Sequence, residues 1–161
     1  MKTQKTYTVD EATKVLEHFC AYQERCHKEV EKKLYNLNMI PEAKEKIILH
    51  LLQHNFLNEE RFAKAFVRGK FSIKKWGRIK IISQLKFKQV SIYNIKTALQ
   101  EIDEEAYFKT LQKIAEKKLT LIKETNNYKK RNKLSNYLIS KGFESNLVYK
   151  IVNSLFTDLN H

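Results

Sequence analysis

Apolar and polar positions follow the period of an α-helix along this chain, and the pattern recurs three times. Val30, Leu34 and Leu37 have the i, i+4, i+7 spacing that places side chains on one helical face. Apolar positions match again 51 residues later and once more 53 residues after that, without gaps inside the matched blocks. The matched sets are Val30/Ile81/Leu134, Leu34/Leu85/Leu138, Met39/Val90/Phe143, Ile47/Ala98/Ile151, Ile48/Leu99/Val152 and Leu51/Ile102/Leu155. A fixed period of this length indicates tandem helical repeats.

Each repeat is expected to contain three helices. The first helices are predicted at about 8–24, 58–73 and 103–124, with Asp10, Asn58 and Asp103 as cap residues. The second helices carry the matched columns that begin at Val30, Ile81 and Leu134. The third helices are predicted at about 41–54, 91–102 and 145–157. In the turns before them, Pro41 suits the first position of a helix, Ser91 and Ser145 suit N-caps, and Gly142 suits a left-handed helix end.

The predicted fold is therefore all-α, built from three tandem three-helix repeats with limits at 1–57, 58–102 and 103–161. The 161 residues include only three Gly and one Pro, too few for an all-β fold or for Gly-rich phosphate loops. Hydrophobic residues make up 42% of the chain, which permits a packed core. A three-helix bundle of this size is small for independent stability, so neighbouring repeats are expected to support one another.

Positive charge is concentrated in the middle repeat. The net charge is +13, and no Asp or Glu occurs from Arg61 to Gln100, where eleven Lys and Arg residues lie. The rest of the chain carries 20 basic and 18 acidic residues. A generally Lys-rich composition would spread the excess evenly, so the favoured interpretation is a surface that faces a polyanion. We expect these eleven cations to point outward, unopposed by carboxylates.

The two cysteines and the lack of long apolar stretches indicate where in the cell the protein is expected. Cys20 and Cys26 are the only cysteines, and they have no C-x-x-C spacing, so we expect reduced thiols in a cytosolic protein. The first residues lack the apolar stretch of a signal peptide, and no window approaches 18 uncharged apolar residues. We therefore expect neither secretion nor a membrane-spanning segment, and no membrane partner.

A specific pattern covers residues 56–92. It consists of Phe56-Leu57-Asn58-Glu59-Glu60-Arg61-Phe62, then Lys74-Lys75-Trp76-Gly77-Arg78-Ile79-Lys80-Ile81, then Leu85 and Val90-Ser91. This pattern resembles that of the RecX family of regulatory proteins: an aromatic-Leu-acidic-acidic-x-Arg-Phe helix start, Lys-x-aromatic-Gly, a basic-Ile pair, a Leu, and a Gly-Ile/Val-Ser turn. Two positions depart from it, Gln89 where the family usually has Gly and Arg78 where Pro is frequent. The third repeat keeps Lys141-Gly142-Phe143.

The resemblance implies a modulator of the RecA recombinase. Members of the family bind in the helical groove of the RecA filament on single-stranded DNA, usually inhibiting ATPase, strand-exchange and co-protease activities, and so regulate DNA repair, recombination and the SOS response. The implied molecule is a curved, elongated array of the three repeats. We accordingly expect a non-enzymatic, cytoplasmic monomer without a cofactor, whose partners are a RecA-type filament and its single-stranded DNA. The alternative is a general nucleic-acid-binding helical module without a dedicated protein partner.

The candidate binding residues lie in the middle repeat. They are Lys64, Arg68, Lys70, Lys74, Lys75, Trp76, Arg78, Lys80, Lys86 and Lys88. Ideal helical phase places Lys64, Arg68 and Lys75 on one side of their helix, if the helix extends that far. Lys and Arg here would neutralise phosphates in a salt-sensitive way.

Some of these residues also have structural interpretations. Trp76 could stack on a base, although a packing aromatic at a helix junction is the favoured role. Arg61 is as well suited to bonding a neighbouring helix end or Glu59 as to contacting a ligand. Gly77 is expected to serve the backbone geometry between helices.

Other candidate chemistry is weaker. The run Lys129, Lys130, Arg131 and Lys133 is most simply a solvated helical face, although it could extend the positive surface. His50 and His54 share an i, i+4 spacing, but further zinc ligands are not evident. The chain contains no G-x-S-x-G and no phosphate-binding P-loop, so no catalytic residue and no metal site are predicted.

Overall fold

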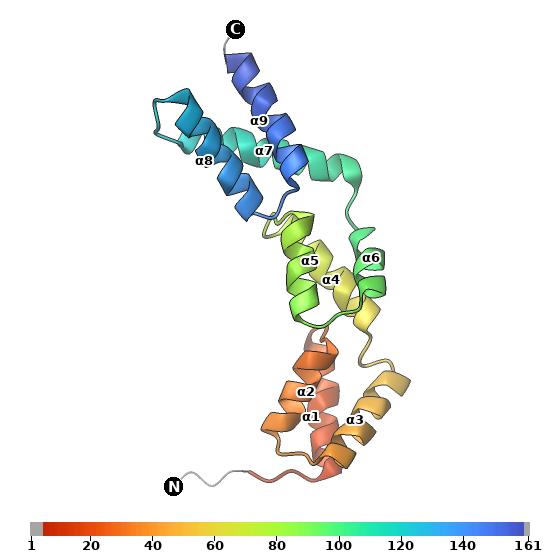
Figure 1. Cartoon of the computed structure of the whole chain (residues 1–161). Coiled ribbons are helices and arrows are strands. Elements are labelled where there is room, and N and C mark those ends of the chain that lie inside the picture. The colour runs from red at the N-terminus through yellow and green to blue at the C-terminus, as the bar shows by residue number, and fades with distance from the viewer. Residues whose placement is uncertain (1–4, 160–161) are drawn as a thin grey trace. The chain divides into compact units, whose positions relative to one another are not determined.

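The computed structural model describes residues 5–159, and the side chains of residues 5–157, as an all-α protein. Within that range there are nine helices and no strand (Figure 1). They are α1 (Val9–Tyr22), α2 (His27–Asn36), α3 (Pro41–Gln53), α4 (Glu59–Ser72), α5 (Arg78–Phe87), α6 (Ile92–Leu99), α7 (Glu104–Leu121), α8 (Asn127–Ser140) and α9 (Ser145–Leu159). None of these helices combines the length and the apolar character needed to cross a membrane. The predicted all-α array of helical repeats is confirmed.

The repeated sequence columns produce a repeated core. The two strongest columns lie on α2, α5 and α8, and all six of their side chains have no exposed surface: Val30, Ile81, Leu134, Leu34, Leu85 and Leu138. In the turn that follows, Val90 and Phe143 are also buried. Burial of a Val, Leu or Ile side chain contributes about 1.5–3 kcal/mol, so the same two positions stabilise each copy of the pattern.

The turn after each of these helices contains one residue in the left-handed conformation. Asn38 has φ 59°, Gln89 has φ 63° and Gly142 has φ 98°. These three positions are separated by the same 51 and 53 residues as the apolar columns. The prediction for Gly142 is confirmed. Gln89 has a positive φ as Gly142 does, so the turn after α5 keeps a left-handed residue although it lacks the glycine.

Helix starts follow local capping chemistry, with two corrections. The Asn58 side chain accepts a hydrogen bond from the Arg61 amide at 2.9 Å, and Asp103 and Ser91 accept from amides three residues on at 3.0 and 3.2 Å, as predicted. Asp10 is not the first cap, because Thr8 and Glu11 form a reciprocal capping box. Pro41 opens α3 as expected.

The second correction concerns Ser145. This residue begins α9 instead of capping it, because the Glu144 carbonyl accepts from the amides of Leu147 and Val148 at 3.1 and 3.0 Å. The N-cap of α9 is therefore Glu144, one residue before the predicted Ser145. The Glu144 side chain does not cap the helix, because it bonds Arg78 and Tyr107.

The chain divides into two compact units, and each is described by itself. Unit 1 contains residues up to 65 together with 86–98, and unit 2 contains 66–85 together with the chain from 99 onward. In unit 1, α1, α2 and α3 pack around Leu16, Leu34 and Leu51. In unit 2, α7, α8 and α9 pack on one another. Helices α4 and α5 each run from one unit into the other, and the predicted repeat limits stay a prediction.

Candidate nucleic-acid interface

Arg61 has an intramolecular role in unit 1. Its Nε lies 2.6 Å from Glu24 Oε1, and its Nη2 donates to the carbonyl oxygens of Asn55 and Phe56 at 3.0 and 3.3 Å. These carbonyls follow the end of α3, so the predicted bond to a neighbouring helix end is confirmed. Of the two intramolecular alternatives, the structure selects the helix end, and the acidic partner is Glu24 instead of Glu59.

Arg78 is held by two glutamates in unit 2. Its Nη1 lies 2.9 Å from Glu144 Oε2 and its Nη2 lies 2.6 Å from Glu104 Oε1, while the guanidinium lies 3.9 Å from the centre of the Tyr107 ring. The side chain is only 19% exposed. The Tyr107 hydroxyl donates to Glu144 and accepts from the Arg78 amide, the latter at 3.0 Å. We conclude that Arg78 serves the fold, because both of its terminal nitrogens already bind glutamates.

Burial accounts for the unusual titration of this site. It raises the pKa of Tyr107, and the hydrogen bond to Glu144 raises that pKa further. The phenol therefore keeps its proton to a higher pH than an exposed tyrosine does, and it donates this proton to Glu144. Arg78, Tyr107 and Glu144 thus form one fixed network that ties the start of α5 to α7 and to the start of α9.

Gly77 and Gly142 bring two backbones into direct contact. The Gly77 amide donates to the Lys141 carbonyl at 2.8 Å, and the Ile79 amide donates to the Gly142 carbonyl at 2.9 Å. A Cβ atom on Gly77 would lie 2.3 Å from the Gly142 carbonyl carbon and oxygen. The predicted geometric role of Gly77 is confirmed, and its partner is the turn between α8 and α9. The contact places the α4–α5 connection, residues 73–77, beside Lys141.

Five lysines gather with Trp76 at this connection, and we call this group the Trp76 cluster: Lys70, Lys74, Lys75, Lys80 and Lys141. The Nζ atoms of Lys70 and Lys80 lie 4.8 and 4.5 Å from the centre of the indole, within the range of a cation–π contact. Lys141 Nζ donates to the Lys74 carbonyl at 3.1 Å. Within the described part of the chain, no carboxylate forms an ion pair with any of the five.

The electrostatics of the Trp76 cluster favour an anionic partner. Burial lowers the pKa of Lys141, and the neighbouring charges of Lys80 and Lys74 lower it further. A like-charge group of this kind is stabilised when phosphate or carboxylate oxygens bind to it. Trp76 is half-buried at the junction of α4 and α5, where the favoured interpretation put it.

The remaining predicted residues do not join the Trp76 cluster. Lys64 lies 3.1 Å from Glu60 in unit 1, and Arg68 lies 3.5 Å from Glu101 in unit 2. Exposed pairs of this kind contribute about 0–1 kcal/mol, so both cations could still exchange partners. Helix α4 ends at Ser72, so Lys75 does not share a helical face with Lys64 and Arg68.

Two further predicted residues, Lys86 and Lys88, belong to unit 1. The expectation of eleven unopposed cations is therefore wrong for Arg61, Lys64, Arg68 and Arg78, each of which has a glutamate within 4 Å. The supply of carboxylates from outside the 61–100 stretch explains the difference. Lys70, Lys74, Lys75, Trp76 and Lys80 are the predicted residues that the structure brings together.

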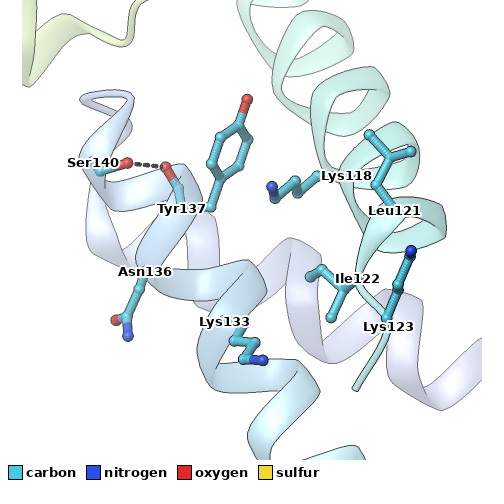
Figure 2. Close-up of a pocket in the computed structure, with 8 residues that line it drawn as sticks. All are labelled: Lys118, Leu121, Ile122, Lys123, Lys133, Asn136, Tyr137 and Ser140. Atoms are coloured by element: carbon cyan, nitrogen blue, oxygen red, sulfur yellow. Dashed lines mark hydrogen bonds between the residues drawn. The ribbon is translucent and has the colours of Figure 1, made fainter. Parts of the chain in front are cut away.

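A groove between α7 and α8 adjoins the Trp76 cluster in unit 2. It consists of two hollows of about 550 and 350 Å³ that share Lys118, Leu121 and Tyr137, and we call it the α7–α8 groove. The larger hollow, drawn in Figure 2, is also lined by Ile122, Lys123, Lys133, Asn136 and Ser140. The smaller hollow is also lined by Lys75, Ile114, Lys117 and Lys141. Because Lys75 and Lys141 belong to both features, the positive surface is continuous.

Sequence reasoning missed most of this surface, including its cations Lys117, Lys118, Lys123 and Lys141 and the ring of Tyr137. A usable signal was present, since Lys117, Lys118 and Leu121 lie within one turn of a helix that has few acidic residues after Glu116. The noted run in the third repeat contributes Lys133, which pairs with Glu124 at 3.3 Å. Its neighbour Arg131 bonds Asn153 and stacks over Phe156, so it has a structural role.

Reactive thiols and metal ligands do not gather at this surface. Both cysteines are free and buried, and burial raises the pKa of Cys20 and of Cys26 to about 11. The rings of His50 and His54 lie 4.4 Å apart in unit 1. No group of three His, Cys, Asp or Glu side chains that could hold a metal ion occurs in the described part of the chain.

Known proteins that resemble this chain agree with one another. Residues 58–99 match the family description "RecX, second three-helix domain", and residues 104–152 match "RecX, third three-helix domain". A protein named Regulatory protein RecX from Clostridium perfringens (strain 13 / Type A) is 32% identical over 133 residues, which cover 81% of this chain and 62% of the relative. The Regulatory protein RecX of Oceanobacillus iheyensis is 26% identical over 150 residues, covering 93% of this chain and 55% of the relative. The chain thus spans less than two thirds of the length of these curated relatives.

The fold comparison points the same way. The crystal structure of RecX from Lactobacillus salivarius superposes with a TM-score of 0.82 over 92% of this chain and 97% of that chain, at 23% sequence identity. At this identity the likeness concerns the fold alone. The matched domains, which together span most of residues 58–152, and the relatives named above supply the rest of the case. On this evidence the chain belongs to the RecX family of regulatory proteins.

Proposed function

We propose that this protein binds a RecA-type recombinase filament on single-stranded DNA and inhibits its ATPase, strand-exchange and co-protease activities. Membership of the RecX family is the observation that carries the proposal, because a regulatory protein acts by binding a partner. The Trp76 cluster supports it, since five lysines without a paired carboxylate suit the anionic surface of a nucleoprotein filament. The protein acts as a cytoplasmic monomer without a cofactor, and through this filament it regulates DNA repair and recombination.

The direct test measures the recombinase. Single-strand-dependent ATPase and strand exchange of the cognate RecA are followed while the protein is added at substoichiometric amounts. Inhibition that deepens with added protein is expected. No change in either activity at any ratio would sink the proposal.

A charge-reversal variant tests the surface. Lys74→Glu, Lys75→Glu and Lys80→Glu together are expected to weaken inhibition while the helical circular dichroism stays unchanged, because Lys74 and Lys75 are exposed and Lys80 is only half-buried. The matched control is Lys14→Glu, Lys32→Glu and Lys46→Glu, which makes the same charge change at exposed positions of unit 1. An inhibition curve shared by both variants and the wild type would contradict the assignment.

The second candidate is a general nucleic-acid-binding module without a dedicated protein partner. The α7–α8 groove favours it, because the groove combines lysines with an aromatic ring. This function requires equal affinity for a naked single strand and for the recombinase filament, with a steep dependence on salt in both cases. A clear preference for the filament selects the first candidate.

A further inference from the structure

The α7–α8 groove is one continuous feature in which positive charge surrounds an aromatic ring. Lys118 of α7 extends towards Tyr137 of α8, with its Nζ 4.5 Å from the centre of the ring (Figure 2). Lys118, Leu121 and Tyr137 line both hollows, so a ligand in one hollow can continue into the other. The ring therefore lies at the middle of the groove.

Cations flank this ring on both sides. Lys123 and Lys133 line the larger hollow, and Lys75, Lys117 and Lys141 line the smaller one. Within residues 5–157, Lys133 is the one of these five lysines that forms an ion pair, with Glu124 at 3.3 Å. No carboxylate lines either hollow in that same part of the chain. The groove thus offers spaced sites for several phosphates.

The apolar surface in the groove decides which polyanion fits. Leu121 is 62% exposed, and Ile122 and Tyr137 are half-buried beside it. A segment of acidic residues alone would use the lysines and leave these apolar atoms uncovered, whereas a nucleic-acid base would cover them. A base pair cannot present its flat face to a ring that lies between two helices, whereas an unpaired base can. Proteins that bind single strands combine a cationic track for phosphates with aromatic platforms for bases.

We propose that the α7–α8 groove is a binding site for single-stranded nucleic acid. The backbone phosphates lie along Lys75, Lys117, Lys118 and Lys141, and one base stacks on Tyr137. This assignment deepens the proposed function and rests on it, since it names the part of the protein that contacts the strand. It places most of the strand on the third matched domain, residues 104–152, with Lys75 as the contribution of the middle repeat.

The first test measures binding of a labelled oligothymidine to the full chain by fluorescence anisotropy, without a recombinase. The triple variant Lys75→Gln/Lys117→Gln/Lys118→Gln is expected to bind about ten-fold more weakly or worse, and the slope of log affinity against log salt becomes shallower by about two. The control triple Lys14→Gln/Lys32→Gln/Lys46→Gln removes the same charge from unit 1 and is expected to retain nearly full affinity. Equal losses in the two triples would overturn the proposal, because they would show binding by net charge alone.

The second test isolates the ring. Tyr137→Phe keeps a stacking surface and is expected to bind as the wild type does, whereas Tyr137→Leu is expected to lose roughly ten-fold. Since Tyr137 is half-buried, circular dichroism is recorded for both variants. A measurement on the wild type avoids any folding defect: ultraviolet crosslinking to an oligonucleotide with a halogenated uracil is expected to modify Tyr137. Crosslinks confined to other aromatic residues would refute the site.

Competition identifies the ligand class. All competitors are compared at equal concentrations of negative charge. Oligothymidine is expected to displace the labelled strand at a lower concentration than poly-glutamate does, or than a duplex of equal length does. Displacement by poly-glutamate or duplex at the same charge concentration would overturn the choice of a single strand. The recombinase assay is scored separately: a wild type that binds the strand in the groove but leaves RecA unaffected would retain this site and refute the proposed function.

Discussion

At the scale of the residue, three equivalent turns need a left-handed backbone, and three different residues provide it. Asn38 and Gly142 belong to the residue types that tolerate this conformation, whereas Gln89 does not. A Cβ in the left-handed region comes close to the following carbonyl oxygen, at a cost of roughly 1–2 kcal/mol. The α5–α6 turn therefore stores strain that the other two turns avoid.

Replacing this glutamine should stabilise the protein. Gln89→Gly is expected to raise the free energy of unfolding by about 1 kcal/mol, because glycine adopts this φ without a steric penalty. Urea denaturation followed by circular dichroism measures the change. Asn38→Gly is the matched control in the same unit and should gain less, since asparagine already tolerates the turn. Equal gains at the two positions would contradict the assignment of strain to Gln89.

The buried thiols predict a loss of stability at alkaline pH. Burial raises the pKa of Cys20 and Cys26 from 9.0 to about 11. Between these values the unfolded chain releases two protons that the folded chain retains, so the free energy of unfolding falls as pH rises from 9 to 11. Below pH 9 both states hold the protons and the contribution is fully present.

Urea midpoints at pH 8, 9, 10 and 11 test this expectation. The wild type should lose more stability across the series than the double variant Cys20→Ala/Cys26→Ala, which lacks both thiols. Tyr107 also has a raised pKa and loses stability in the same direction, so some decline remains in the variant. Parallel pH curves for the two proteins would show that the thiols do not contribute.

Local chemistry was predictable at this scale, and long-range partners were not. The roles of Pro41, Asn58 and Gly142 follow from backbone preferences of the residue and its immediate neighbours. Arg61 bonds Glu24, which lies 37 residues away in sequence, and Arg78 bonds Glu144, which lies 66 residues away. Only the packing of helices brings these pairs together, so a single sequence carried no signal for them.

At the scale of the element, the start of α5 depends on a contact with the α8–α9 turn. Two backbone hydrogen bonds and the Arg78–Tyr107–Glu144 network converge there. The contact is possible because neither Gly77 nor Gly142 has a side chain. The orientation of α5 in unit 2 is therefore set by backbone proximity as well as by its apolar face.

A pair of glycine variants tests this contact. Gly77→Ala is expected to lower the free energy of unfolding by about 2–3 kcal/mol, because its Cβ would lie 2.3 Å from the Gly142 backbone. Gly69→Ala is the control in the same unit, where a Cβ meets nothing within 4 Å. This second change should add about 0.5–1 kcal/mol through helix propensity alone. Destabilisation by both variants, measured by urea titration, would count against a specific contact.

Helices could be predicted more fully than the surfaces between them. The apolar period predicted the nine helices that lie within residues 5–159, and their ends differ from expectation by a few residues. Helix α7, for example, ends at Leu121 instead of about 124. The α7–α8 groove was not predictable, because its walls come from α7, α8 and the α4–α5 connection. Helical periodicity describes which face of one helix is buried and says nothing about the spacing between two helices.

At the scale of the whole molecule, two helices belong to both units. Helix α4 passes from unit 1 to unit 2 after Ala65, and α5 passes from unit 2 to unit 1 after Leu85. Unfolding of one unit would fray a helix of the other, and helical hydrogen bonds form cooperatively. We therefore expect one unfolding transition for the chain.

Two probes can test this cooperativity. Trp76, the single tryptophan, reports on unit 2 by fluorescence, and the reactivity of Cys20 and Cys26 with a thiol reagent reports on unit 1. The two urea midpoints are expected to coincide, and Gly77→Ala should lower both together. Separate midpoints would show that the units unfold independently.

The charge pattern of the whole chain predicted the candidate surface in part. The excess of Lys and Arg between residues 61 and 100 singled out Lys70, Lys74, Lys75 and Lys80 as candidates. The structure groups these four lysines with Trp76. Charge counting treats every cation alike, so it did not separate these lysines from Arg78, whose donors bind Glu104 and Glu144. Burial and geometry are required to tell a structural cation from an available one.

The contact between Gly77 and Gly142 also limits how this protein can diverge. Each position excludes a side chain because of the backbone or Cβ atom of a neighbour, and no replacement at the other position moves that backbone aside. A larger residue at Gly77 therefore cannot be accommodated by trimming a neighbouring side chain, because the three nearest atoms there belong to the backbone. A change at either glycine would therefore lower stability unless the α4–α5 connection or the α8–α9 turn were rearranged as well.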